Sequence, residues 1–284
     1  MKFTKPIHFS LDIKRQENGI LSFMQKRKKL LVGNWKMAPA TLAEAKHIFG
    51  KIKRAASRAR NVAVVLCPSD LHLIPLARLA RKGKVSLGVQ DIFWEDSGLF
   101  TGQISPAMAK DAGARFVIVG HSEKRRLGET NEQVSKKLAA VLRDGLIPIL
   151  CFGESERDRD GHFYDTLKTQ LIESLGRVRS DAFSKSLILA YEPVWEIGRP
   201  DMKAMKPSDI HEISIFIRKV INDAFGAGAS AAATILYGGS VSPENARAIC
   251  YEGEADGLLV GRLSLDPDGF SEVIRQLDKN NGKR

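Results

Sequence analysis

The sequence predicts an α/β protein that folds as a single (β/α)8 barrel. Eight short apolar runs recur at fairly even intervals, helical patterns lie between them, and no linker rich in proline, glycine or serine divides the middle of the chain. The 284 residues, 43% hydrophobic and 27% charged, suffice for one large domain. A doubly wound open sheet is the alternative, but no GxGxxG follows the first run.

The eight apolar runs are the expected strands. Most of them are uninterrupted rather than alternating, which is typical of parallel strands that are buried on both faces. In chain order they cover residues 30–33, 62–66, 85–89, 116–119, 147–152, 187–190, 234–237 and 257–260.

Helices are expected between these strands. Residues 41–60 are rich in alanine, lysine and glutamate, and 130–144 open with a Thr-Asn-Glu-Gln sequence like a capping box. Residues 207–224 begin Pro-Ser-Asp and carry isoleucines at helical spacing, and 243–251 follow a Ser-Pro start. We therefore assign residues 29–278 to the catalytic barrel.

The net charge of +11 is concentrated at the two ends of the chain. Residues 1–29 carry +6 and residues 275–284 carry +3, which leaves +2 for the 245 residues between them. Residues 1–28 are predicted to be a basic N-terminal extension that is flexible or not translated, with synthesis of the protein beginning at Met24. Residues 279–284 are predicted to be a basic tail. No basic stretch is interleaved with base-stacking aromatics, so no specific nucleic acid is expected.

A cytoplasmic location is expected. No apolar run approaches the roughly 18–20 residues that span a bilayer, and charges interrupt any signal-like segment near the start. The three cysteines do not form a CxxC pair and are too few for a disulfide framework.

Glu192 is the most informative candidate residue. The run LILAYEPVW (187–195) brings one carboxylate to the end of a buried strand, between two aromatic residues. Partial burial there would raise the pKa of the carboxyl and make it a usable proton acceptor near neutral pH. A structural ion pair with a lysine or arginine is the alternative.

Other polar residues also follow strands, where barrel enzymes place their chemistry. Asn34 and Lys36 follow the first strand, and Lys36 could offer a fixed charge to an anion or lie along the surface. His121 follows the fourth strand at the start of a helix, which would keep the imidazole neutral, unless it is a hydrogen-bonded structural histidine.

Glycine-rich turns follow the last two strands. Gly238-Gly239-Ser240 and Gly261 would let backbone N–H groups approach an anion, a recurring phosphate site in such barrels. No cluster has metal-ligand spacing, and no cofactor is expected. Together these strand ends favour proton transfer beside a carbonyl group of a small phosphorylated substrate.

The chain resembles the triosephosphate isomerase family, whose fold is the TIM barrel. The resemblance lies in seven ordered segments: GNWKM (33–37), SGLFTGQISPAM (97–108), VIVGHSEKR (117–125), CFGE (151–154), AYEPVW (190–195), ILYGGSV (235–241) and DGLLVG (256–261). It implies an aldose–ketose isomerase of glycolysis and gluconeogenesis that interconverts dihydroxyacetone phosphate and D-glyceraldehyde 3-phosphate. Glu192 would be its base, His121 its electrophile, and Asn34 and Lys36 its substrate-binding pair.

The resemblance also implies how phosphate and a second subunit bind. The loop around Thr101 would enter a neighbouring subunit and form a homodimer. Residues 193–195 would be the first hinge of a lid. The implied phosphate-binding residues are Gly198, Ser240, Gly261 and Arg262.

Several residues depart from the family pattern. Arg262 stands where a second glycine is usual, Glu196 replaces a small residue, and Arg199-Pro200 replaces Thr-Gly at the lid tip. Two other functions therefore stay open: isomerisation of a tetrulose phosphate, and a non-catalytic barrel that only binds.

Overall fold

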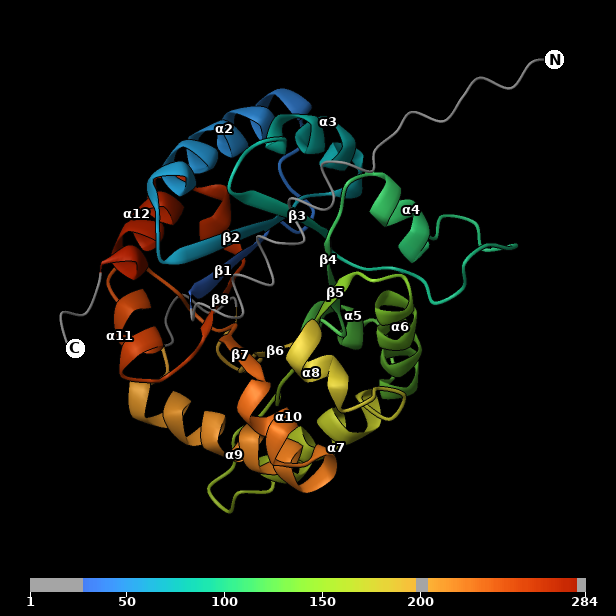
Figure 1. The fold of residues 1–284 in the computed structure, drawn as a ribbon. Helices are drawn as coiled ribbons and strands as arrows, with labels where there is room; N and C mark the ends of the chain where they lie inside the picture. Colours follow the sequence, from blue (N-terminus) through green and yellow to red (C-terminus); the bar gives the residue numbers. More distant parts are fainter. Residues whose placement is uncertain (1–27, 198–203, 280–284) are drawn as a thin grey trace.

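A computed structural model describes residues 28–197 and 204–279 and confirms the predicted barrel. Eight strands close into one sheet in the order β1 to β8, with β1 paired to β8 (Figure 1). Every neighbouring pair is parallel, so all carboxyl ends lie at the same mouth. The strands are β1 Lys29–Asn34, β2 Val62–Cys67, β3 Val85–Val89, β4 Phe116–Val119, β5 Ile147–Phe152, β6 Ile188–Tyr191, β7 Thr234–Tyr237 and β8 Gly257–Val260.

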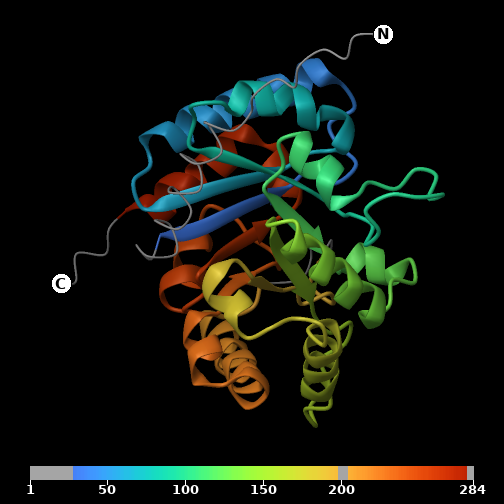
Figure 2. The same cartoon turned by 45° about the vertical axis from the view of Figure 1, so that its right-hand side comes forward.

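Helices surround the barrel on its outside (Figures 1 and 2). In chain order they are α2 Leu42–Arg58, α3 Asp70–Ala80, α4 Pro106–Asp111, α5 Ser122–Arg126, α6 Asn131–Arg143, α7 Phe163–Ser174, α8 Asp181–Lys185, α9 Pro207–Phe225, α10 Ala227–Ala232, α11 Ala246–Tyr251, the 3-10 helix η1 Arg262–Leu265 and α12 Pro267–Asp278. None of the helices in the described ranges is long and apolar enough to cross a membrane.

Side chains that can cap a helix explain where two of the predicted helices begin. The Thr41 hydroxyl accepts the Glu44 N–H at the start of α2. Thr130 and Gln133 form the predicted capping box of α6. The helix predicted from residue 243 begins only at Ala246.

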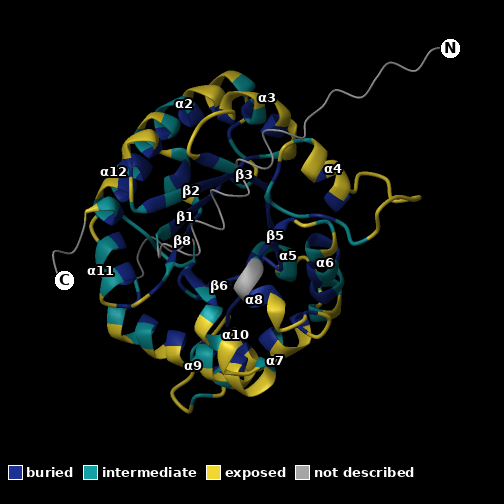
Figure 3. Ribbon diagram, viewed as in Figure 1, coloured by how far each residue is buried: buried dark blue, intermediate teal, exposed yellow. Residues whose placement is uncertain are grey.

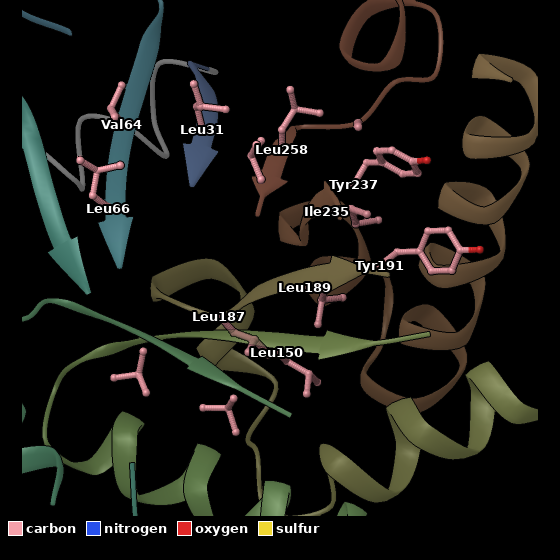
Figure 4. Close-up of a cluster of buried hydrophobic side chains, with 14 of the residues drawn as sticks. Leu31, Val64, Leu66, Leu150, Leu187, Leu189, Tyr191, Ile235, Tyr237 and Leu258 are labelled. Carbon is pink, nitrogen blue, oxygen red and sulfur yellow. The ribbon is translucent and has the colours of Figure 1, made fainter. Parts of the chain in front are cut away.

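Buried side chains form two clusters on opposite faces of the sheet. One consists of strand residues alone and fills the barrel, including Leu30, Val32, Ile188 and Ala190. The other lies between strands and helices; Figure 4 shows part of it, including Tyr191 and Tyr237. Figure 3 shows the same division, with buried strands inside and exposed helix faces outside.

The alternation of strand side chains places two predicted site residues toward the barrel axis. Asn34 follows Val32 by two residues, and Glu192 follows Ala190 by two. Because alternate residues share one face of a strand, both side chains continue the interior set at the mouth. The predicted N-terminal extension and the C-terminal tail lie outside the described residues, except Lys28 and Lys279.

Candidate active site

The predicted strand-end residues surround one cavity at the mouth of the barrel. Its volume is about 850 Å³, within the usual range for a small-molecule site. Its lining includes Asn34, Lys36, His121, Glu192, Ser240 and Gly261, together with Arg262. Gly198, the remaining predicted phosphate residue, lies outside the described residues.

Glu192 is held at the edge of this cavity by two neighbours. Its side chain is 2% exposed. Its Oε2 accepts the Ser122 N–H at 2.9 Å, and its Oε1 lies 3.2 Å from Nε2 of His121. A lysine or arginine partner, the structural alternative, is absent among the described residues. The carboxylate therefore faces neutral donors and the cavity.

His121 is the N-cap of α5, and its contacts indicate its tautomer. Its Nδ1 accepts the Glu123 N–H at 3.2 Å, so this nitrogen carries a lone pair. In the neutral ring the proton then lies on Nε2, the nitrogen that faces Glu192. This tautomer presents the Nε2–H of His121 to the cavity as a hydrogen-bond donor.

Lys36 has an unusual backbone that its neighbours stabilise. Its φ angle is 54°, a left-handed conformation that is rare for a residue with a side chain. Oδ1 of Asn34 accepts the Lys36 N–H at 3.0 Å, and Nε2 of Gln90 donates to the Lys36 carbonyl at 2.8 Å. Asn34 and Gln90 thus fix the turn that aims the ammonium group.

Glu123 holds the Lys36 ammonium in place, a role that the sequence did not reveal. Oε1 of Glu123 lies 2.7 Å from Nζ of Lys36. Partial burial raises the pKa of Glu123, but the hydrogen bond and charge of Lys36 outweigh it, with help from His121 and Arg126, so the pKa is lowered. Glu123 therefore stays ionised. In the sequence, the only indication of this role was that Glu123 lies two residues after His121.

The predicted phosphate-binding turn after β8 lies beside the same ammonium group. A Cβ added to Gly261 would lie 3.6 Å from Nζ of Lys36, so the turn after β8 approaches this cation closely. Arg262 is exposed and lines the cavity. Its guanidinium makes no hydrogen bond or ion pair within the described ranges.

Ser240 differs from the expectation that its backbone is free to bind an anion. Its N–H donates to Oε1 of Glu196 at 2.8 Å. Glu196 is completely buried, and its two oxygens also accept the Tyr237 hydroxyl, at 2.9 and 2.8 Å. The sequence marked Glu196 as unusual but did not predict these contacts.

A second buried carboxylate, Glu154, joins the ends of β5 and β6 to the predicted hinge. Its Oε1 accepts the Tyr191 hydroxyl at 2.7 Å and Nε1–H of Trp195 at 2.8 Å. Burial raises its pKa, and these two hydrogen bonds oppose the rise only in part. This residue was within the CFGE segment, but only the structure shows what it contacts.

No group of three or more His, Cys, Asp or Glu side chains in the described parts of the chain could hold a metal ion. The three cysteines are free and buried, and burial raises the pKa of each thiol, most clearly Cys67 and Cys151. These thiols are therefore protonated near neutral pH. The cavity instead holds a carboxylate, an imidazole N–H donor and an ammonium group, a set suited to moving a proton beside a carbonyl.

The chain is similar to known proteins over most of its length. Residues 29–277 match the family model described as triosephosphate isomerase. The triosephosphate isomerase of Citrifermentans bemidjiense is 41% identical over 253 residues, covering 88% of this chain and 98% of that protein. That of Moorella thermoacetica is 39% identical over 250 residues, covering 87% and 98%. The crystal structure of the enzyme from Bartonella henselae has a TM-score of 0.77 at 30% identity, covering 89% of this chain and 100% of that one.

Proposed function

The chain belongs to the triosephosphate isomerase family, and we propose that the strand-end cavity is the site where it interconverts dihydroxyacetone phosphate and D-glyceraldehyde 3-phosphate. The protein is an aldose–ketose isomerase. One observation carries the assignment to this cavity: the Glu192 carboxylate, the His121 N–H donor and the Lys36 ammonium line the same cavity.

Glu192 is the proposed base. Its carboxylate takes a proton from the hydroxyl-bearing carbon beside the substrate carbonyl and returns it to the former carbonyl carbon. The hydroxyl proton moves to the former carbonyl oxygen, and the hydroxyl oxygen becomes the new carbonyl oxygen. The C–H electron pair forms the carbon–carbon double bond of an enediolate, and the carbonyl electron pair moves onto oxygen. The neutral contacts of Glu192 leave its charge available to the substrate.

His121 and Lys36 stabilise the charge that develops on oxygen. Nε2–H of His121 donates to the substrate oxygens, because Nδ1 is already occupied by the Glu123 N–H. The Lys36 ammonium, fixed by Glu123, adds a positive charge near these oxygens. Donors fixed before the reaction stabilise a transition state without the cost of reorganisation.

The phosphate group lies at the turns after β7 and β8, beside Lys36. Gly261 supports this placement because its backbone approaches the lysine side chain without a Cβ between them. The remaining predicted phosphate residues are Gly198, Ser240 and Arg262.

The test is an assay of the full chain with D-glyceraldehyde 3-phosphate and with tetrulose phosphates. Glu192→Gln keeps the size of the side chain but removes the base, so kcat should fall by about 10²–10⁴-fold. Glu192→Asp keeps a carboxylate and should lose less. Preference for a tetrulose phosphate would move the assignment to the larger sugar, and turnover of neither substrate would indicate a binding protein.

The proposal includes a cytoplasmic homodimer. The loop between β3 and α4 projects from the barrel (Figures 1 and 2). Within this loop Leu99 is fully exposed and Phe100 is half-exposed. Met37 and Leu127 are also highly exposed. We expect a second subunit to cover these apolar side chains, which would remove apolar surface from water.

A further inference from the structure

Glu196 is a buried acid that the proposed reaction does not use. It lies four residues after Glu192, and its relative exposure is 0%. No lysine, arginine or histidine of the described residues forms an ion pair with it. A buried carboxylate is costly unless hydrogen bonds satisfy it, so its donors indicate why it is tolerated here.

Three neutral donors satisfy both oxygens of Glu196. Oε1 accepts the Ser240 N–H at 2.8 Å, Oε2 accepts the Met205 N–H at 3.3 Å, and the Tyr237 hydroxyl lies within 2.9 Å of both. Displacing Ser240 would remove a donor from a fully buried charge, which is costly. The contact with Ser240 is therefore a stable part of the site.

This contact changes what the phosphate turn can offer. A backbone N–H carries one hydrogen, so the Ser240 N–H that donates to Glu196 is not available to a phosphate oxygen. The site therefore lacks one donor.

The guanidinium of Arg262 can replace the phosphate donor that Glu196 takes from the site. It lines the cavity next to Gly261, and its guanidinium is without a partner among the described residues. A guanidinium binds phosphate through two parallel N–H groups and adds a positive charge. Its chain neighbour Gly261 lies close to the Lys36 side chain.

We infer that Glu196 permanently occupies the Ser240 N–H and that the Arg262 guanidinium replaces this N–H as a phosphate ligand, so that the two unusual residues form a compensating pair. Glu196 is thus a positioning residue and Arg262 a specificity-determining one. The inference rests on the proposed function, because it assumes that the phosphate group of the substrate binds at these turns.

A double-mutant cycle tests the pair, with inorganic phosphate as the calorimetric probe and glyceraldehyde 3-phosphate as substrate. Arg262→Gly should weaken phosphate binding and raise KM by about tenfold, with kcat changed less than about threefold, whereas Arg262→Lys should lose less. In the Glu196→Ala background the Ser240 N–H is free to bind phosphate, so Arg262→Gly should cost less than about threefold. Equal losses in both backgrounds, or no loss from Arg262→Gly, would overturn the inference.

Two further measurements keep the test decisive if Glu196→Ala folds poorly. Glu196→Gln keeps an oxygen that accepts the Ser240 N–H, so Arg262→Gly should still cost about tenfold in that background. In a phosphate titration followed by amide NMR of the wild-type chain, the Gly261 signal should shift while the Ser240 signal stays. A Ser240 shift as large as that of Gly261 contradicts the inference. If phosphate binding changes as expected but neither triose phosphate is turned over, the proposed function is contradicted and the inference about Glu196 and Arg262 is not.

Discussion

At the scale of single residues, glycines fix the position of the proposed base as firmly as its hydrogen bonds do. A Cβ added to Gly153 would lie 1.7 Å from the Glu192 carbonyl oxygen, and one added to Gly238 would lie 3.0 Å from Cγ of Glu192. Glycine at both positions therefore lets β5, β6 and β7 approach closely enough to place Glu192 at the barrel mouth.

Gly153→Ala should lower both stability and activity. The new methyl group has no room unless the backbone of Glu192 moves, and overpacking of this kind costs roughly 1–3 kcal/mol or more. The change should reduce the melting temperature and kcat together. Gly50→Ala is the matched control, because the nearest atom to its Cβ is 3.8 Å away and Gly50 lies within α2. That variant should gain up to about 1 kcal/mol; a stable, fully active Gly153→Ala would contradict the argument.

The site residues that the sequence predicts are those whose place follows from the fold alone. Asn34, His121 and Glu192 follow predicted strands, and all carboxyl ends of a parallel barrel meet at one mouth. The contacts of Glu123 and Glu196 were beyond prediction, because they depend on which donor each carboxylate reaches across the barrel.

At the scale of elements, Glu154 connects two strand ends to the segment that follows the proposed base. It accepts hydrogen bonds from Tyr191 at the end of β6 and from Trp195. Its Oε2 is buried and has no hydrogen-bond partner among the described residues. Burial raises its pKa. The connection therefore includes a carboxyl group whose ionised form costs the folded protein stability.

This cost predicts how stability depends on pH. The pKa of Glu154 is higher in the folded state than in the unfolded state. Between these two pKa values the folded state therefore binds more protons than the unfolded state. The contribution of Glu154 to the free energy of unfolding consequently falls as pH rises. The melting temperature of Glu154→Gln minus that of wild type should therefore increase between about pH 4 and pH 7. The increase should be a few degrees if the free energies of unfolding differ by ~1 kcal/mol.

Glu244→Gln is the control for this pH dependence. A hydrogen bond from Ser242 lowers the pKa of Glu244. The contribution of Glu244 to stability therefore does not fall as pH rises, and the melting temperature of Glu244→Gln should not increase relative to wild type. A difference between Glu154→Gln and wild type that is constant across pH would show that the ionisation of Glu154 does not affect stability.

Strands were easier to predict than helix boundaries for a physical reason. An uninterrupted buried run shows in the sequence, and so does a capping threonine such as Thr130. The helix predicted from residue 243 begins later because the Asn245 side chain accepts the Ser242 N–H and donates to the Ser240 carbonyl. Asn245 thus forms a turn with the loop before it, which propensity alone does not indicate.

At the scale of the whole molecule, the projecting loop and the first strand end connect assembly to the proposed chemistry. Met37 is 99% exposed and comes directly after Lys36 in the chain. The backbone of Lys36 is left-handed and has to be held by neighbouring residues. If the homodimer forms through the loop around Thr101, Met37 and Leu99 lose solvent contact on assembly. The position of the Lys36 ammonium then depends on the second subunit.

Leu99→Asp should therefore dissociate the protein and impair it as a catalyst. The wild-type chain of 31.3 kDa should sediment at about twice this mass. A charge at position 99 opposes burial of the loop in the partner, so the variant should shift toward monomer. Because a displacement of about 1 Å in a catalytic group can cost roughly 10²-fold, kcat/KM should fall by at least about tenfold. Ile215→Asp on α9, also an exposed apolar position, should change neither mass nor kcat/KM. A wild-type monomer, or a Leu99→Asp dimer with full activity, would show that this loop does not complete the site.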